Sequence, residues 1–232
     1  MNRQTLGSQK DWSRRARLVR GAALLACLLL GAPAAGLCAV EADLSRPDAD
    51  GAPTSVHVDL YLADLSQISG SDQSFLADVV VQAEWLDPRL AGRWAGVHGV
   101  ALDDVWNPRL QLVNQRGVTA SFPQRLEVEP SGRVHWRQRW LGRFSVRMDL
   151  REFPLDRQSF HVQVVSLGYA RDEVELMVNA ESPRSGRAAE LSISDWAVGP
   201  VGIEIADFEP APGAKVLSGV RLRWEGRRHV SY

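Results

Sequence analysis

The chain has 232 residues and a formal net charge of −1, with 27 basic and 28 acidic side chains. Six basic residues and one acidic residue precede position 40, so the other 193 residues carry 21 basic and 27 acidic side chains, a net charge of −6. A mildly acidic domain of this size can bury a sizeable core, and it is a poor candidate for binding nucleic acid.

The first 39 residues have the composition of a secretory leader. Arginine and lysine side chains precede the apolar run GAALLACLLLGAPAAGLCA, which ends near Ala39. Gly31, Pro33 and Gly36 would weaken a membrane-spanning helix, which favours a signal peptide cleaved after Ala39 over a retained anchor. The paired arginines in SRRARLV resemble a twin-arginine export signal, but Arg17 stands where that signal usually has a large apolar residue.

Both cysteines of the chain, Cys27 and Cys38, fall inside this leader. The mature chain is therefore predicted to have no disulfide and no cysteine metal site, and we expect neither a metal ion nor a cofactor. Residues 40–53 are acidic and rich in turn formers, which predicts a disordered lead-in. The ordered domain is expected to occupy residues 54–232, where no apolar run reaches the roughly 18 residues of a membrane-spanning helix.

Alternating apolar and polar residues predict strands through most of this domain. The alternation is clear within residues 56–62, 144–150, 160–164, 201–205 and 220–224. Turn formers separate these runs, and helical periodicity is nearly absent. About ten short strands, without helices to cover parallel crossovers, predict an all-β fold: an antiparallel immunoglobulin-like β-sandwich.

Catalytic motifs are missing from the sequence. It contains no nucleophile elbow, no HExxH zinc motif and no phosphate-binding loop, and its five histidines are scattered singly. An enzyme is therefore not expected. Tryptophan is abundant, with seven of the eight after the leader, and such rings either fill a core or form an exposed platform for a sugar or a cation.

Several motifs follow one another along the domain. They are WLDPRL from Trp85, VWNPRLQLVN around Trp106, GRVHWRQRWLGRFSV from Gly132, MDLREFPLDRQSF from Met148, ISDWAV around Trp196, and the C-terminal RRHVSY. In this order and spacing they resemble the extracellular ligand-binding domain of pentameric ligand-gated ion channels, the Cys-loop receptor superfamily, in its bacterial form.

The resemblance implies a sensor domain that faces the periplasm or the cell exterior. It would belong to a homopentameric channel in the cell membrane, whose missing pore helices would follow Tyr232. Binding of a small-molecule ligand or of protons at subunit interfaces would then control the pore. Two alternatives stay open: a secreted, soluble pentameric binding protein of the same fold, and a carbohydrate-binding β-sandwich that uses its tryptophans as a platform.

A signature loop connects two strands in this superfamily. In animal members two cysteines close it, and their positions correspond here to Val146 and Phe160; bacterial members lack that bridge. Burial of two apolar residues can hold such a loop without a covalent bond.

The same resemblance gives the residues that would couple this loop to a pore. Pro154 would fix a bend, Phe153 would project as an apolar wedge, and Asp156 would pair with an arginine of the pre-membrane segment, where Arg227 matches best. The alternative is a plain hairpin turn with a surface salt bridge.

The aromatic box that binds amines in the superfamily is largely missing, because Val80, Val113 and Leu167 stand at three of its positions. The candidate ligand-binding residues are instead Gln111, Arg125, Arg137, Tyr169 and Phe208. The arginines favour a small polar or anionic ligand over a quaternary amine, with proton sensing by acidic and histidine side chains as the alternative.

Overall fold

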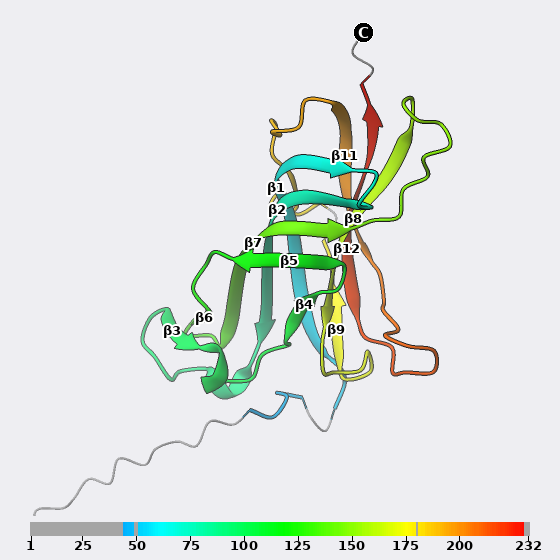
Figure 1. The fold of residues 1–232 in the computed structure, drawn as a ribbon. Coiled ribbons are helices and arrows are strands. Elements are labelled where there is room, and N and C mark those ends of the chain that lie inside the picture. Colours follow the sequence, from blue (N-terminus) through cyan, green and yellow to red (C-terminus); the bar gives the residue numbers. More distant parts are fainter. Residues whose placement is uncertain (1–43, 49–50, 180, 230–232) are drawn as a thin grey trace, which may run out of the picture. The chain divides into compact units, whose positions relative to one another are not determined.

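The computed structural model describes residues 44–48, 51–179 and 181–229 (Figure 1). The described residues all belong to one compact unit, Glu41–Tyr232. The predicted signal peptide, residues 1–39, lies outside the described residues. Within the described ranges, the only helices are two short 3-10 turns, η1 (Pro88–Leu90) and η2 (Leu102–Asp104), and no helix is long and apolar enough to span a membrane.

In the described part of the chain, twelve strands form two sheets. The larger sheet contains β1 (Thr54–Ser69), β2 (Ser74–Leu86), β3 (His98–Ala101), β5 (Gln115–Ala120), β6 (Arg125–Val128), β7 (Arg133–Ser145), β9 (Val174–Met177) and β10 (Gly186–Arg187). The smaller sheet contains β4 (Leu110–Leu112), β8 (Arg157–Ser166), β11 (Trp196–Ile205) and β12 (Gly219–Arg228). The strand orders are β10-β1-β2-β7-β6-β3, with β5 on β7 and β9 on β1, and β11-β12-β8-β4.

The core lies between the two sheets, because each strand turns alternate side chains inward. In β12, Val220, Leu222 and Trp224 are buried, whereas Arg223 and Glu225 are exposed. An aromatic cluster from both sheets fills one part of the core: Phe75, Phe144, Phe160, Trp196 and Trp224. The predicted all-β sandwich is confirmed.

The predicted strand runs lie within β1, β8, β11 and β12, with one exception. The run at residues 144–150 is confirmed only at its start, because β7 ends at Ser145. Val146 and Met148 are nevertheless buried, so their apolar character reports burial in a loop rather than a strand. The number of strands exceeds the expected ten because very short strands, such as the two-residue β10, pair with the edge of β1.

The larger sheet is not purely antiparallel, which differs from the prediction. β9 and β10 pair with β1 in parallel. A parallel pair within one sheet needs a long crossover connection, but the chain reaches β9 from β8, which belongs to the other sheet. No covering helix is therefore required.

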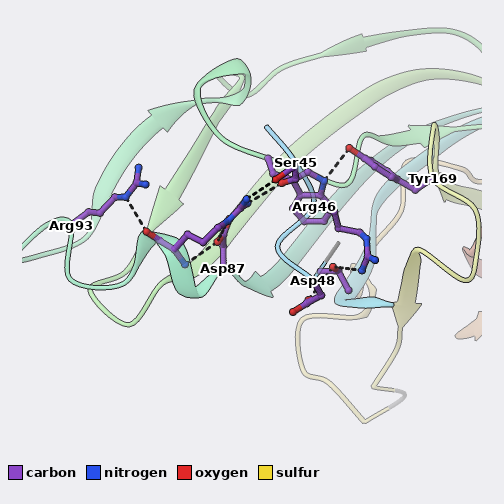
Figure 2. A network of polar contacts seen from close by, with 9 residues as sticks. Ser45, Arg46, Asp48, Asp87, Arg93 and Tyr169 are labelled. Carbon is purple, nitrogen blue, oxygen red and sulfur yellow. Dashed lines mark hydrogen bonds and ion pairs between the residues drawn. The ribbon is translucent and has the colours of Figure 1, made fainter. Parts of the chain in front are cut away.

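The described part of the predicted lead-in is held against the sandwich. Arg46 donates to the carbonyl oxygen of Ala52 at 2.8 Å and to the hydroxyl of Thr54 at 3.2 Å, and Arg89 donates to the carbonyl oxygen of Ser45 at 2.9 Å. Figure 2 shows Ser45, Arg46 and Asp48 within this network. Arginine donors thus connect the described residues of this segment to the sandwich, and the disorder expected of residues 40–53 stays a prediction.

Candidate functional site

The signature loop runs from Val146 to Phe160: residues 146–156 connect β7 to β8, and its last four residues are the start of β8. Figure 1 shows it in yellow-green beside the end of β12. Val146 is 5% exposed and Phe160 is 1% exposed, so the residues at the two cysteine positions of animal relatives both belong to the core. Burying one such side chain contributes about 1.5–3 kcal/mol, so the two together are comparable to a typical disulfide.

A buried glutamine holds the interior of this loop together. The Gln158 side-chain nitrogen donates to the carboxylate of Asp156 at 2.8 Å and also to the carbonyl oxygen of Asp149. The Gln158 side-chain oxygen accepts from the backbone nitrogen of Asp149 at 3.0 Å. These bonds fix the two sides of the loop relative to each other.

Asp156 joins the loop to the last strand. Its carboxylate is 1% exposed and accepts from Nε of Arg228 at 2.8 Å, while the backbone nitrogen of Arg228 donates to the Asp156 carbonyl at 3.2 Å. Burial raises the pKa of Asp156, but the hydrogen bonds from Arg228 and Gln158 outweigh burial and hold the pKa below its ordinary value of 3.8. The carboxylate therefore stays ionised and paired at neutral pH.

The partner of Asp156 is Arg228, and the prediction of Arg227 is wrong by one residue. Side chains alternate along β12, so Arg228 follows the buried positions Trp224 and Gly226 on the inner face. Arg227 is exposed on the other face, opposite Arg157 in β8. Strand alternation, carried four residues beyond the predicted run at 220–224, would have selected Arg228.

Aromatic rings enclose the Arg228 guanidinium. Its central carbon lies 4.4 Å from the ring centroid of Trp196 and 5.0 Å from that of Phe153. Phe153 is itself 62% exposed, and Leu155, after Pro154, is 69% exposed. The turn at residues 151–155 thus combines a ring in contact with Arg228 and an apolar outer surface, and its role as a wedge stays a prediction.

The candidate ligand-binding residues fall into two groups. Arg125 and Arg137 line one surface pocket of about 490 Å³, here named the arginine pocket, together with Phe122, His135 and Glu129. The guanidinium carbon of Arg137 lies 5.5 Å from the Phe122 ring centroid, and Arg125 donates to the carbonyl oxygen of Gly99 at 3.1 Å. Among the described residues, no carboxylate forms an ion pair with Arg137.

Tyr169, Phe208 and Gln111 lie on other elements and do not line this pocket. The Tyr169 hydroxyl accepts from the indole nitrogen of Trp106 at 3.0 Å (Figure 2). Phe208 pairs with Leu217 in the β11–β12 connection. Gln111 is exposed on β4. The structure thus separates the arginines from the remaining candidates within one chain.

A histidine and two carboxylates beside the arginines were not among the predicted residues. Nε2 of His135 lies 2.8 Å from a carboxylate oxygen of Glu129, and Nδ1 of His135 lies 3.8 Å from Glu84. The hydrogen bond from His135 lowers the pKa of Glu129. Alternation along β7 puts Arg133, His135 and Arg137 on one face, and this pattern could have identified the histidine. Across the described ranges, no group of three possible ligands could hold a metal ion.

The tryptophans do not form an exposed platform. Of the seven after the leader, Trp85, Trp106, Trp136, Trp196 and Trp224 are buried. Trp94 and Trp140 are only partly exposed. This burial argues against the carbohydrate-binding alternative, because stacking on a sugar needs exposed ring faces.

The WLDPRL motif has a structural role. Asp87, 1% exposed, accepts from the backbone nitrogen of Arg89 at 3.1 Å and so caps η1, and it also forms an ion pair with the Arg89 side chain at 2.8 Å. Trp85 packs edge-on against Trp106, with ring centroids 5.8 Å apart. The motif therefore fixes the turn after β2.

Comparison with known proteins identifies the family. The model of the neurotransmitter-gated ion-channel ligand-binding domain matches residues 42–198. The gamma-aminobutyric acid receptor alpha-like protein of Drosophila melanogaster is 26% identical over 159 residues, which cover 65% of this chain and 23% of that protein. Gamma-aminobutyric acid receptor subunit beta-4 of Gallus gallus is 28% identical over 138 residues, or 56% of this chain and 28% of that protein.

The chain thus spans about a quarter of the length of these relatives. Both relatives are receptor subunits rather than enzymes, and the family match covers the whole larger sheet together with β4, β8 and the start of β11 from the smaller sheet. The chain therefore belongs to the family of neurotransmitter-gated ion-channel ligand-binding domains, the Cys-loop receptor family.

Proposed function

We propose that this chain is the ligand-sensing domain of a homopentameric ligand-gated channel, exported by residues 1–39 and facing the periplasm or the cell exterior. The observation that carries the coupling part of this proposal is the buried pair of Asp156 and Arg228. It ties the signature loop to the end of the strand that leads toward Tyr232. In this proposal, pore-forming helices follow that residue.

The coupling depends on the rigidity of this contact. Arg228 is held by one ion pair, by its backbone hydrogen bond and by two rings, so β12 and the loop move together. A twist of the smaller sheet would displace the exposed side chains of Phe153 and Leu155. Those side chains would transmit the displacement to the membrane domain.

We propose a small anionic ligand for the arginine pocket. Arg137 is exposed and lacks a carboxylate partner among the described residues, so its guanidinium can donate two hydrogen bonds to a ligand carboxylate. Tyr169 and Phe208 lie on different elements, and a neighbouring subunit would supply them across an interface. A complete site would therefore require two subunits.

Protons are the second candidate, supported by the contact between His135 and Glu129. Protonation of His135 would strengthen its attraction to both Glu129 and Glu84 at the edge of the same pocket. Acidic pH would then change the charge of the interface without any ligand.

A graft tests these proposals. Residues 40–232 would be fused to the pore of a bacterial member of the superfamily, and currents recorded while pH and a panel of small carboxylates are varied. We expect currents that Arg137→Gln shifts about tenfold to higher carboxylate concentration, whereas His135→Gln would abolish any response to pH alone. A graft that assembles at the surface and stays silent under all conditions would contradict a sensing role.

The coding sequence after Tyr232 tests the channel assignment separately. An in-frame apolar span would support a channel subunit. A stop codon at that point would favour the soluble pentameric alternative.

A further inference from the structure

The turn between β1 and β2, residues 70–73, lies against the signature loop. A Cβ atom added to Gly70 would lie 3.2 Å from a methyl carbon of Leu150, so the turn and this leucine are in contact. Arg116 of β5 also holds the turn, because its Nη1 donates to the carbonyl oxygen of Asp72 at 3.0 Å. The turn therefore contacts two segments that are distant from it in the sequence.

One residue of this turn, Gln73, bonds to the signature loop with both its backbone and its side chain. Its carbonyl oxygen accepts from the backbone nitrogen of Val146 at 2.9 Å, and its side-chain oxygen accepts from the backbone nitrogen of Met148 at 2.6 Å. Its side-chain nitrogen donates to the carbonyl oxygen of Gly70 at 2.7 Å. A single carboxamide thus joins the turn to the loop.

These bonds satisfy the backbone where the loop leaves the sheet. β7 ends at Ser145, so Val146 and Met148 lie beyond the last strand residue. Both residues are buried, and a buried backbone N–H group without an acceptor destabilises the fold. Gln73 supplies the acceptor for both N–H groups.

The backbone of Gln73 supports a specific role for its side chain. Its φ angle is 50°, and within the described ranges Arg109 is the only other non-glycine residue with a positive φ. Glycine adopts this conformation without steric cost, but it has no side chain to accept from Met148. A glutamine at a position that favours glycine indicates that the carboxamide itself is needed there.

The signature loop is consequently bonded to both sheets of the sandwich. Gln73 ties it to the turn between β1 and β2 of the larger sheet, whereas Arg228 ties Asp156 to β12 of the smaller sheet. A displacement of one sheet relative to the other would therefore act on the loop through two fixed points.

We propose that Gln73 is a positioning residue for gating, which makes the turn at residues 70–73 and the signature loop move as one body. This inference rests on the proposed function of the chain as a sensor domain. The bonds of Gln73 themselves lie within one chain and can be tested without a pore.

Amide hydrogen exchange of the full chain, followed by nuclear magnetic resonance, tests the tie. Gln73→Asn keeps a carboxamide and tolerates a positive φ, but its side chain is too short to reach Met148. We expect the Met148 amide to exchange about tenfold faster in this variant, while the Val146 amide, bonded to the backbone carbonyl, keeps its rate. Gln73→Glu retains an acceptor for Met148 and should restore slow exchange.

The matched control is Gln67→Asn, because Gln67 is exposed on β1 and its side chain accepts only from Arg143, at 3.4 Å, among the described residues. It should leave the exchange of Met148 unchanged. Equal Met148 exchange in Gln73→Asn and the unsubstituted chain would overturn the tie, as would equal acceleration by Gln67→Asn.

Currents from the graft test the gating role, with acidification and acetate as the stimuli. Gln73→Asn should shift half-maximal activation about tenfold toward stronger stimulus, and Gln73→Glu and Gln67→Asn should respond like the unsubstituted graft. Unchanged activation in Gln73→Asn, with faster Met148 exchange, would leave a structural tie and overturn the gating role. A graft silent in every form would contradict the sensor function itself, whereas the exchange experiment would still decide the tie.

Discussion

In the signature loop the central carboxylate is buried and paired within one chain, whereas in the arginine pocket Arg137 is exposed and has no carboxylate partner among the described residues. The loop is therefore complete as it stands, and its interactions contribute to the stability of the sandwich. In the arginine pocket, the guanidinium of Arg137 can still form hydrogen bonds to a ligand. We expect substitutions in the loop to change the free energy of unfolding, and substitutions in the pocket to change ligand binding.

The largest effect is expected from Phe160→Ala. Phe160 contacts the rings of Phe75, Trp196 and Trp224, so its truncation leaves a cavity and should cost about 3–5 kcal/mol of unfolding free energy. Urea unfolding of both proteins measures the difference. Phe153→Ala in the exposed turn is the control, and a similar loss in the two variants would show that burial does not hold the loop.

Asp156→Asn should have the next largest effect. It leaves the largely buried Arg228 without its counter-charge, and breaking such a pair costs about 3 kcal/mol. The matched control is Asp149→Asn, because Asp149 pairs with Arg151 in the same loop but both side chains are exposed. Equal unfolding midpoints for the two variants would contradict the assigned role of Asp156.

The effect of Asp156 should depend on pH. Its folded-state pKa is lower than the unfolded value of about 3.9, so its contribution is complete above that value and is lost as pH falls through the folded-state pKa. Urea unfolding of the unsubstituted chain and Asp156→Asn between about pH 6 and pH 2 should therefore show converging stabilities below about pH 4. A constant difference over that range would show that the carboxylate is not the titrating group.

Arg137→Gln should leave the unfolding free energy within about 0.5 kcal/mol, because the side chain is exposed. In the grafted channel, the same change should weaken a carboxylate ligand about tenfold, or roughly 1.4 kcal/mol. A stability loss as large as that of Asp156→Asn would remove the distinction between the two regions.

The smallest effect is expected from Arg227→Gln. Arg227 points away from the loop, so both unfolding and gating should stay close to those of the unsubstituted protein, whereas Arg228→Gln should impair both. Urea unfolding and currents from the graft measure the two properties. Gating that fails with Arg227→Gln but not with Arg228→Gln would support Arg227, rather than Arg228, as the coupling arginine.

The sequence by itself determined the fold class and the family. Alternation with a period of two is a local property, so the strands around Val58, Val162 and Leu222 could be recognised without knowing their neighbours. The motifs from Trp85 to Trp196 predicted the family on the same local basis. The burial of Val146 and Phe160 also followed from their apolar character.

Tertiary structure alone decided which distant residues meet. The parallel pairing of β9 with β1 and the contact of His135 with Glu84 both join segments whose spacing in the chain is not periodic. The identity of the arginine that pairs with Asp156, predicted as Arg227 and found to be Arg228, depended partly on each. Alternation settles which side chain points inward, but only the folded loop brings Asp156 to that face, because the contact spans 72 residues of chain.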